Sequence, residues 1–153
     1  MERSTDAYRI EAVTTVSIEE LTSLYNSVGW TAYTKDITKL QSAIQGSDFV
    51  VTVTKQEKDT ALLIGLARAI SDDASIAYIQ DILVHPDHQS KGIGKRLVQS
   101  ILERYSHVRQ KVLLTDDRPE QISFYQSLGF SNTRTLCSTP LNAFVMIDGV
   151  KLS

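Results

Sequence analysis

The stretch from residue 78 to residue 98 has the sequence YIQDILVHPDHQSKGIGKRLV and carries three signals. An apolar segment that ends at Val84 predicts a strand, a polar turn follows, and a glycine-rich loop then opens a helix. Such a loop leaves several backbone N–H groups unpaired at the helix N-terminus, where phosphate groups bind readily. Gly92 and Gly94 let the backbone approach an anion closely because they have no Cβ atom. We therefore expect a ligand that carries phosphate groups and is bound mainly by main-chain atoms.

The spacing of the glycines excludes the two common nucleotide-binding patterns. The Walker pattern needs a glycine five positions before Gly94 and a Ser or Thr after the lysine, and neither is present. The dinucleotide pattern GxGxxG needs a third glycine, but Leu97 stands at that position. The pattern that remains is QxxGxG, from Gln89 to Gly94, directly after a strand that ends in Val-His-Pro.

This pattern resembles the loop that binds the pyrophosphate of acyl-CoA in the GNAT superfamily of N-acyltransferases. A second signature of that family, YxxxGF, is present from Tyr125 to Phe130. Both signatures occur in the family's order with one strand pattern between them, which makes the resemblance specific. The alternative is that Gly92 and Gly94 only form a tight turn between strand and helix and bind nothing.

Length and composition limit the classes of protein to consider. A chain of 153 residues is the size of one domain, so we expect a single domain over residues 1–153. The resemblance implies that it is an N-acetyltransferase domain. The formal net charge of −2 does not favour nucleic acid as the main partner. No apolar run follows the N-terminal Met-Glu-Arg, so we expect a cytoplasmic protein with no membrane segment. The only cysteine, Cys137, cannot form an internal disulfide, and we expect it to be a buried small side chain.

Hydrophobic periodicity predicts the order strand, two helices, three strands, helix, strand, helix and two strands. Helices are expected after the capping box at Ser17, after Thr34, after the glycine loop and from Pro119. A break in the alternation near Ile82 indicates a β-bulge or a strand buried on both faces. The expected strands span residues 8–16, 48–54, 60–70, 76–84, 111–115, 133–137 and 143–147.

This order is that of the GNAT fold, and the resemblance covers nearly the whole chain. It implies an α/β protein, an α+β mixed sheet of six to seven strands flanked by about four helices. The fourth and fifth strands should be parallel neighbours, because a helix connects them. In the family these two strands splay apart, and the pantetheine arm of acetyl-CoA lies in the gap.

The resemblance also assigns the residues that bind acetyl-CoA, which is a co-substrate; no metal is expected. The backbone of Ile82, Leu83 and Val84 would hold the pantetheine arm, and one of their N–H groups would polarise the acetyl carbonyl. The family often has an asparagine after the fifth strand, but residues 115–121 contain none, which puts that contact in doubt. The pyrophosphate would be bound by Gln89, Ser90, Lys91, Gly92, Ile93, Gly94 and Lys95.

Forming an amide from a thioester requires a neutral amine, a polarised carbonyl and a proton for the leaving thiolate. By resemblance, Tyr125 is the general acid near the thioester sulfur; the alternative is a core aromatic on an amphipathic helix. Asp81 could orient the amine or act as a base through water, or it could pin the bulge or face solvent. His85 and His88 flank the loop, and we expect polar surface rather than catalysis or metal binding there.

Acceptor specificity is expected in the first two helices and their aromatic connection. Trp30 and Tyr33, with Asp36, would suit a cationic or aromatic amine, although the same residues could form a packed loop. Residues 64–69 and 79–86 are weakly similar to an arylalkylamine-type GNAT subgroup.

The sequence thus predicts an N-acetyltransferase that transfers an acetyl group from acetyl-CoA to a primary amine, by direct attack in a ternary complex. We expect a small-molecule amine as the acceptor and neither nucleic acid nor a membrane as a partner. The alternatives are a protein N-terminus or lysine as acceptor, or a CoA-binding sensor without chemistry. Many GNAT proteins are dimers, so a homodimer is a further expectation.

Overall fold

The computed structural model describes residues 8–150, which form two compact units. The first unit ends at Leu114 and contains the β-sheet with helices α1 to α4. The second begins at Thr115 and contains helix α5 and the C-terminal segment. The expectation of a single domain stays a prediction.

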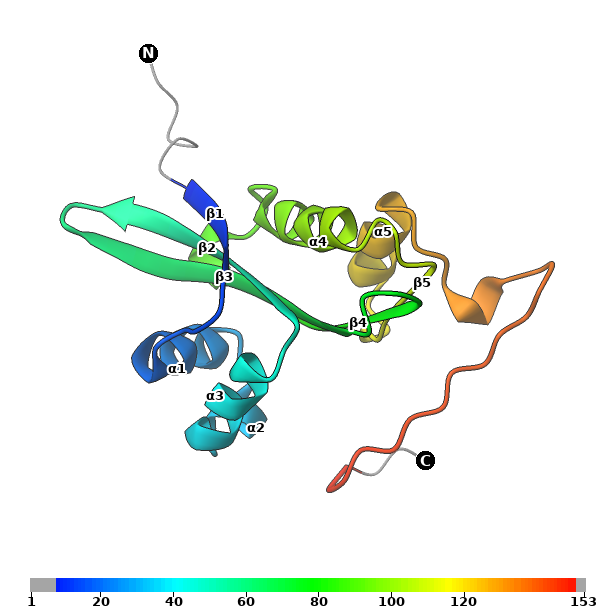
Figure 1. Ribbon diagram of the computed structural model, residues 1–153, viewed down its shortest axis with the longest axis horizontal. Coiled ribbons are helices and arrows are strands. Elements are labelled where there is room, and N and C mark those ends of the chain that lie inside the picture. Colours follow the sequence, from blue (N-terminus) through cyan, green and yellow to red (C-terminus); the bar gives the residue numbers. More distant parts are fainter. Residues whose placement is uncertain (1–7, 151–153) are drawn as a thin grey trace, which may run out of the picture. The chain divides into compact units, whose positions relative to one another are not determined.

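A five-stranded mixed sheet forms the centre of the first unit (Figure 1). The strands lie side by side in the order in which they occur in the chain, and each pair from β1 to β4 is antiparallel. The last pair, β4 with β5, is parallel, as the sequence predicts for strands joined by a helix. The strand bounds are β1 Tyr8–Val13, β2 Phe49–Glu57, β3 Thr60–Ser71, β4 Ile76–Val84 and β5 Gln110–Leu113.

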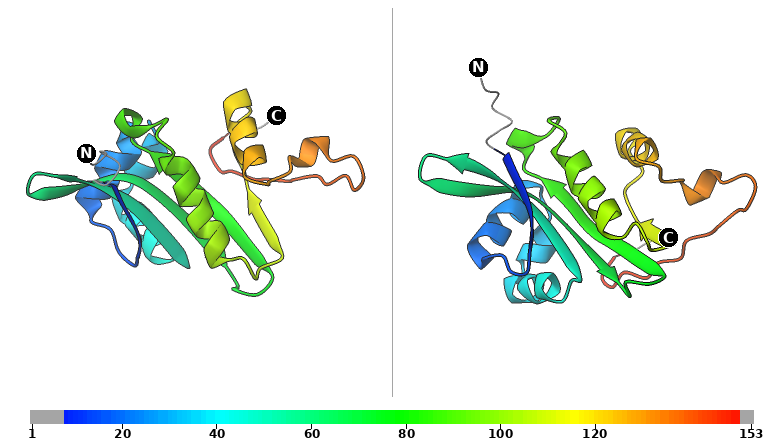
Figure 2. Two further views of the ribbon diagram at one scale, coloured as in Figure 1. Left: turned by 90° about the horizontal axis from the view of Figure 1, so that it is seen from above. Right: turned by 45° about the horizontal axis from the view of Figure 1, so that its top comes forward.

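Helices cover both faces of this sheet. Helices α1 (Ile18–Ser27), α2 (Thr31–Thr34) and α3 (Ile37–Gln45) lie on one face, and α4 (Ile93–Arg104) lies on the other (Figures 1 and 2). Ser17 caps α1 in a capping box, as predicted: its hydroxyl accepts from the Glu20 N–H and donates to the Glu20 carboxylate.

The predicted cap of the second long helix is wrong. Thr34 ends the short helix α2, and its hydroxyl donates to Asn26 instead. Asp36 caps α3, because its carboxylate accepts from the Lys39 N–H.

Each face of the sheet has its own packing. Under α4, Gly65 leaves little room for a side chain: a Cβ atom there would lie 3.3 Å from side-chain atoms of both Ile93 and Leu97. Ala67 and Ala69 follow on the same face of β3 and are fully buried, so small residues let α4 approach the sheet closely. On the opposite face, α1 and α3 pack against the sheet in a core of Leu21, Leu24, Tyr25, Leu40, Ile44, Val50, Leu66 and Leu83.

A β-bulge in β4 confirms the predicted break in its alternation. Arg68 of β3 is opposite Asp81, and the next residue, Ala69, is opposite Ile79, so Gln80 is the extra residue. Because side chains alternate between faces, the extra residue reverses the pattern. Ile79 therefore shares the α4 face with Ala69, whereas Asp81 lies on the α1 and α3 face.

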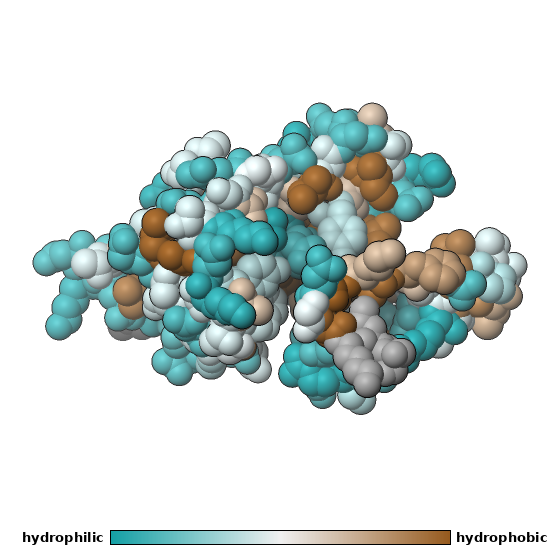
Figure 3. All heavy atoms as spheres, turned by 90° about the horizontal axis from the view of Figure 1, so that it is seen from below, coloured by the Kyte–Doolittle hydropathy of each residue, from teal (hydrophilic) through white to brown (hydrophobic). Residues whose placement is uncertain are grey.

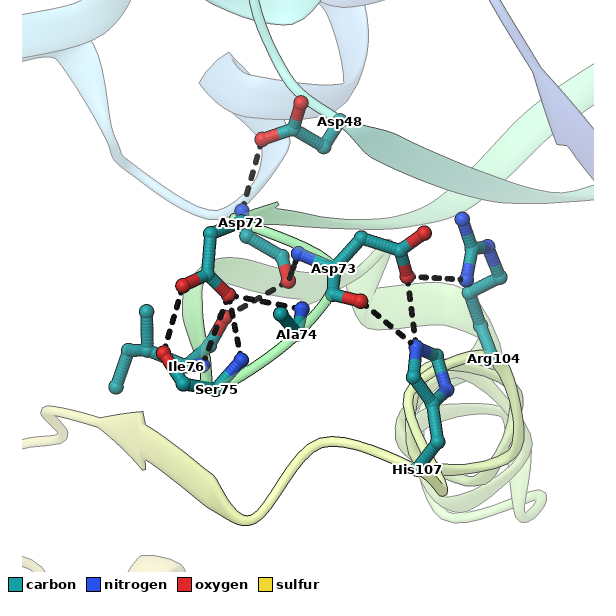
Figure 4. Close-up of polar contacts among 9 residues, drawn as sticks. Asp48, Asp72, Asp73, Ala74, Ser75, Ile76, Arg104 and His107 are labelled. Carbon is teal, nitrogen blue, oxygen red and sulfur yellow. Dashed lines mark hydrogen bonds and ion pairs between the residues drawn. The ribbon is translucent and has the colours of Figure 1, made fainter.

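Carboxylates fix the turn between β3 and β4 (Figure 4). Asp72 accepts the Ser75 hydroxyl and three backbone N–H groups, and these bonds lower the pKa of its carboxyl. Asp73 accepts from Arg104 at 3.1 Å and lies 2.8 Å from Nε2 of His107. The turn is thereby tied to the C-terminal end of α4.

The second unit corrects the prediction of two final strands, so the sheet has five strands and not six or seven. Helix α5 spans Pro119–Ser127, with proline at its start as expected. Residues 133–137 contain a short 3₁₀ helix, Thr133–Thr135, because Asn132 accepts from the Arg134 N–H and so favours a turn. Cys137 is exposed rather than buried.

Residues 143–147 do not form the last predicted strand either. A strand needs a partner for its backbone groups, and residues 115–150 contain no other strand. The apolar side chains of this segment are accordingly exposed, Phe144 to 92% and Met146 to 96%. Hydrophilic residues dominate the face drawn in Figure 3, and hydrophobic ones gather in smaller patches. Within residues 8–150, no helix is long and apolar enough to cross a membrane.

Candidate active site

The glycine loop presents a group of unpaired amides at the start of α4. Ser90 and Gly92 both have left-handed backbone conformations, with φ values of 63° and 80°. Gly92 is the N-cap of α4 and has no side chain that could cap the helix. Its carbonyl accepts a hydrogen bond from the Arg96 N–H. Among the described residues, none accepts a hydrogen bond from the amides of residues 90–95. This geometry suits a diphosphate.

Charged and polar side chains surround the loop. Lys91, Lys95 and Arg96 are exposed and add positive charge beside the amides. Burial and the neighbouring cations Lys55 and Lys91 lower the pKa of His88, which favours its neutral form. Nδ1 of His88 lies 2.9 Å from the Tyr8 hydroxyl, so this histidine connects the loop to the first strand.

Two further side chains shape the turn from β4 into the loop. His85 accepts from the Asp87 N–H through Nδ1, which fixes the short helix Pro86–His88. The amide of Gln89 donates to the Val84 carbonyl at 3.0 Å. The side chain of Gln89 thus holds the loop in place, although the sequence assigns this residue to the cofactor.

The edge of β4 is open where the sequence places the pantetheine arm. The parallel pairing with β5 ends at Ile79, opposite Leu113. Beyond that point, residues 80–84 have no strand partner on the β5 side among the described residues. Ile82 and Val84 are half-buried, and Leu83 is buried in the core against α1 and α3.

Asp81 lies at the centre of a buried polar network. One of its oxygens, Oδ2, accepts from the Tyr25 hydroxyl at 2.9 Å and from Nε of Arg68 at 2.7 Å. The other, Oδ1, accepts from the Tyr33 hydroxyl at 2.7 Å. The side chains of Arg68 and Asp81 are only 7% and 2% exposed. A carboxylate with both oxygens engaged is poorly placed to take a proton from an amine, and these contacts favour its role at the bulge.

The aromatic residues of the first helices gather beside Asp81. Tyr25 and Tyr33 have ring centroids 5.1 Å apart, and Trp30 lies 6.0 to 6.1 Å from both rings. Burial, reinforced by Asp81, raises the pKa of both tyrosines, so both phenols keep their protons and donate. A cavity of about 300 Å³ adjoins Tyr33 and is also lined by Ala32, Asp36, Lys39, Leu40 and Ala43.

Tyr125 belongs to the second unit, where it lies in α5. Its ring is in edge contact with Phe124 at 5.0 Å and with Phe130 at 5.9 Å. Burial, with a smaller contribution from Asp116, raises the pKa of Tyr125 to about 12. The phenol is therefore protonated at neutral pH and can donate a proton.

The sequence profile of the acetyltransferase (GNAT) family matches residues 15–130 of this chain. The chain belongs to the GNAT family. The proteins of this family are acetyltransferases that use acetyl-CoA. The resemblance on which the sequence prediction rests is thus confirmed, and the arylalkylamine subgroup stays a prediction.

Several GNAT relatives are 30% or more identical to this chain. An uncharacterized N-acetyltransferase, ycf52, from Gracilaria tenuistipitata var. liui is 35% identical over 117 residues, which cover 75% of this chain and 62% of the relative. GCN5-related N-acetyltransferase 2, chloroplastic, from Arabidopsis thaliana is 33% identical over 75% of this chain and 50% of its own length. The chain thus spans about half to about two thirds of the length of the curated relatives that it matches.

Solved GNAT structures have the same fold. An acetyltransferase from Streptococcus pneumoniae TIGR4 superposes with a TM-score of 0.77 at 27% identity, covering 93% of this chain and 98% of that one. An aminoglycoside acetyltransferase from a soil metagenomic sample, solved with sisomicin, has a TM-score of 0.66 at 16% identity. The alignment covers 95% of this chain and 99% of that protein, and at this identity it shows the fold alone.

Sequence reasoning misses three residues of the polar network around Asp81, namely Arg68, Tyr25 and Gln80. Arg68 is a charged residue inside an apolar strand, which is a usable signal for a buried ion pair. The sequence predicts Tyr25 only as part of the apolar face of a helix. Its hydroxyl, which donates to Asp81, makes it part of the network. No sequence pattern marks Gln80, because its place in the network depends on the β-bulge in β4.

Proposed function

We propose that this GNAT protein transfers the acetyl group of acetyl-CoA to a primary amine of a small molecule, by direct attack in a ternary complex. The observation that carries the proposal is the loop of free amides at residues 90–95, which also contains the exposed Lys91 and Lys95. A helix N-terminus of this kind suits the pyrophosphate of acetyl-CoA. The aromatic residues Trp30 and Tyr33, beside a cavity that includes Asp36, suit an amine as the acceptor.

In the proposed reaction, the neutral amine attacks the acetyl carbonyl, a C–N bond forms, and the C–S bond breaks. A backbone N–H on the open edge of β4, among residues 82–84, polarises the carbonyl oxygen. Tyr125 gives its proton to the departing thiolate, the amine loses one proton to water, and water returns a proton to the Tyr125 phenolate. We assign Asp81 a positioning role, because its two oxygens hold Tyr25 and Tyr33 in place.

The test is release of CoA thiol from acetyl-CoA with a panel of amines: 2-phenylethylamine, spermidine and a lysine peptide. Release that depends on one of the small amines supports the proposal. The peptide belongs in the panel because a relative from Glycine max is named a histone acetyltransferase, at 32% identity. Tight acetyl-CoA binding by calorimetry without release would instead favour a CoA sensor.

Gly92→Ala is expected to raise the KM for acetyl-CoA about tenfold, with a smaller change in kcat. A Cβ atom at φ +80° costs about 1 to 2 kcal/mol, and the loop would relax and move its amides. Steady-state kinetics with acetyl-CoA as the varied substrate measures this. Gly149→Ala is the matched control, because it has a similar φ of 77° outside the loop. An unchanged KM in Gly92→Ala would contradict the assignment of the loop.

We propose the cytoplasm as the location and a homodimer as the assembly, both of which are further predictions. The Arabidopsis thaliana relative is named chloroplastic, so a plastid is the competing location. Imaging of a fluorescent fusion distinguishes the two locations, and sedimentation equilibrium measures the oligomeric state.

A further inference from the structure

We propose that the side-chain oxygen of Gln80 binds an N–H of the acceptor amine and holds its nitrogen for attack. This inference rests on the proposed acetyl transfer and assigns a residue for acceptor recognition. Gln80 is the extra residue of the bulge in β4, and its side chain is exposed. It lies one residue beyond Ile79, where the pairing with β5 ends and the open edge begins.

The hydrogen-bond network fixes which end of the Gln80 amide faces inward. Nε2 of Gln80 lies 3.1 Å from the Tyr33 oxygen. The Tyr33 hydroxyl has one proton, and that proton is donated to the carboxylate of Asp81, which can only accept. The Tyr33 oxygen must therefore accept from Gln80, so the nitrogen of the amide points to Tyr33. The amide orientation follows from the donors and acceptors around it rather than from its shape.

Hydrogen bonds fix the position of each side chain in this network. Asp81 is fixed by Arg68 and Tyr25, which are both buried, and Tyr33 is fixed by Asp81. Among residues 8–114, no group donates to the oxygen of Gln80, Oε1. The network thus presents a preorganised hydrogen-bond acceptor at the start of the open edge.

An amide oxygen at this point discriminates among nucleophiles. A primary amine has one N–H for Gln80, a lone pair for the carbonyl and a second N–H proton to release after attack. An alcohol has a single O–H proton, which it must lose when it attacks, and the amide oxygen is not a base that could take it. The expected ligand class is therefore a primary amine.

The test compares Gln80→Met, which keeps the length of the side chain without its polar atoms, with the wild-type protein. We expect the KM for the best amine of the panel to rise about tenfold, while the KM for acetyl-CoA stays the same. The matched control is Gln56→Met, because Gln56 is also exposed and its amide also bonds, to the carbonyls of Lys58 and Thr60. An unchanged amine KM in Gln80→Met overturns the inference.

A second readout asks whether Tyr33 acts through Gln80. Tyr33→Phe is expected to raise the amine KM in the wild-type background and to add little in the Gln80→Met background. Full additivity would show that the hydroxyl of Tyr33 does not orient Gln80, and would overturn the proposed chain of bonds.

A binding measurement separates this inference from the proposed function. The side-chain NH₂ signal of Gln80 in a ¹⁵N spectrum is assigned by its loss in Gln80→Met, and CoA-bound protein is titrated with 2-phenylethylamine and then spermidine. A shift of this signal supports the inference even if no thiol is released, in which case acetyl transfer alone fails. No shift with either amine overturns the inference even if thiol is released.

Discussion

Replacing Asp81 with alanine is expected to lower the free energy of unfolding by about 3 to 5 kcal/mol. The substitution leaves the Arg68 side chain, which is 7% exposed, buried without its counter-charge, and it removes the acceptor of two tyrosine hydroxyls. An uncompensated buried charge costs far more than the loss of an exposed ion pair. Urea unfolding followed by circular dichroism measures the change.

Two variants make this result interpretable. Glu57→Ala removes the partner of Lys55 in an ion pair whose carboxylate is 46% exposed, and it is expected to cost at most about 1 kcal/mol. The double variant Arg68→Met with Asp81→Leu buries no charge and is expected to recover much of the lost stability. A cost for Asp81→Ala as small as that of Glu57→Ala would show that the network does not hold this part of the fold.

Tyr125→Phe is expected to lower kcat about 100-fold while leaving the KM for acetyl-CoA nearly unchanged. The ring and its contacts with Phe124 and Phe130 remain, so only the proton donor is lost. The raised pKa, about 12, means that the wild-type phenol carries its proton at every pH of ordinary assays. The measurement is kcat at saturating acetyl-CoA and amine.

Tyr105→Phe is the matched control for this loss. Tyr105 is 1% exposed, and its hydroxyl has no hydrogen-bond partner among the described residues. Removing that hydroxyl is expected to leave kcat unchanged and stability the same or slightly higher, because an unpaired buried hydroxyl is unfavourable. If Tyr125→Phe is as active as Tyr105→Phe, Tyr125 is a packing residue of α5.

The sequence predicts well those parts of the fold that depend on residues close together in the chain. The capping box at Ser17 and the apolar face of α4 depend on residues three or four apart, and both are present in the structure. The expected strands over 133–137 and 143–147 failed because a strand depends on a partner elsewhere in the chain. The Asn132 turn also competes with strand formation locally, and propensity alone does not show which conformation wins.

The same distinction applies to the candidate site. The loop of residues 89–95 is continuous in sequence, so its glycine spacing is visible without a structure. The partners of Asp81 lie 13, 48 and 56 positions away, and no local pattern joins Arg68, Tyr33 and Tyr25 to it. Asp81 is therefore recognisable as a candidate from the sequence, but its buried, fully engaged state is not.

The bulge residue has a consequence for how this scaffold could diverge. Without Gln80, β4 would pair with β3 as a regular strand, and Ile79, Asp81 and Leu83 would keep the faces that they occupy now. The core on both sides of the sheet would thus tolerate a one-residue deletion here. Under the proposed role of Gln80, folding and acceptor choice are separable at this position, so a deletion of one codon would remove the amine contact without rebuilding the protein's interior.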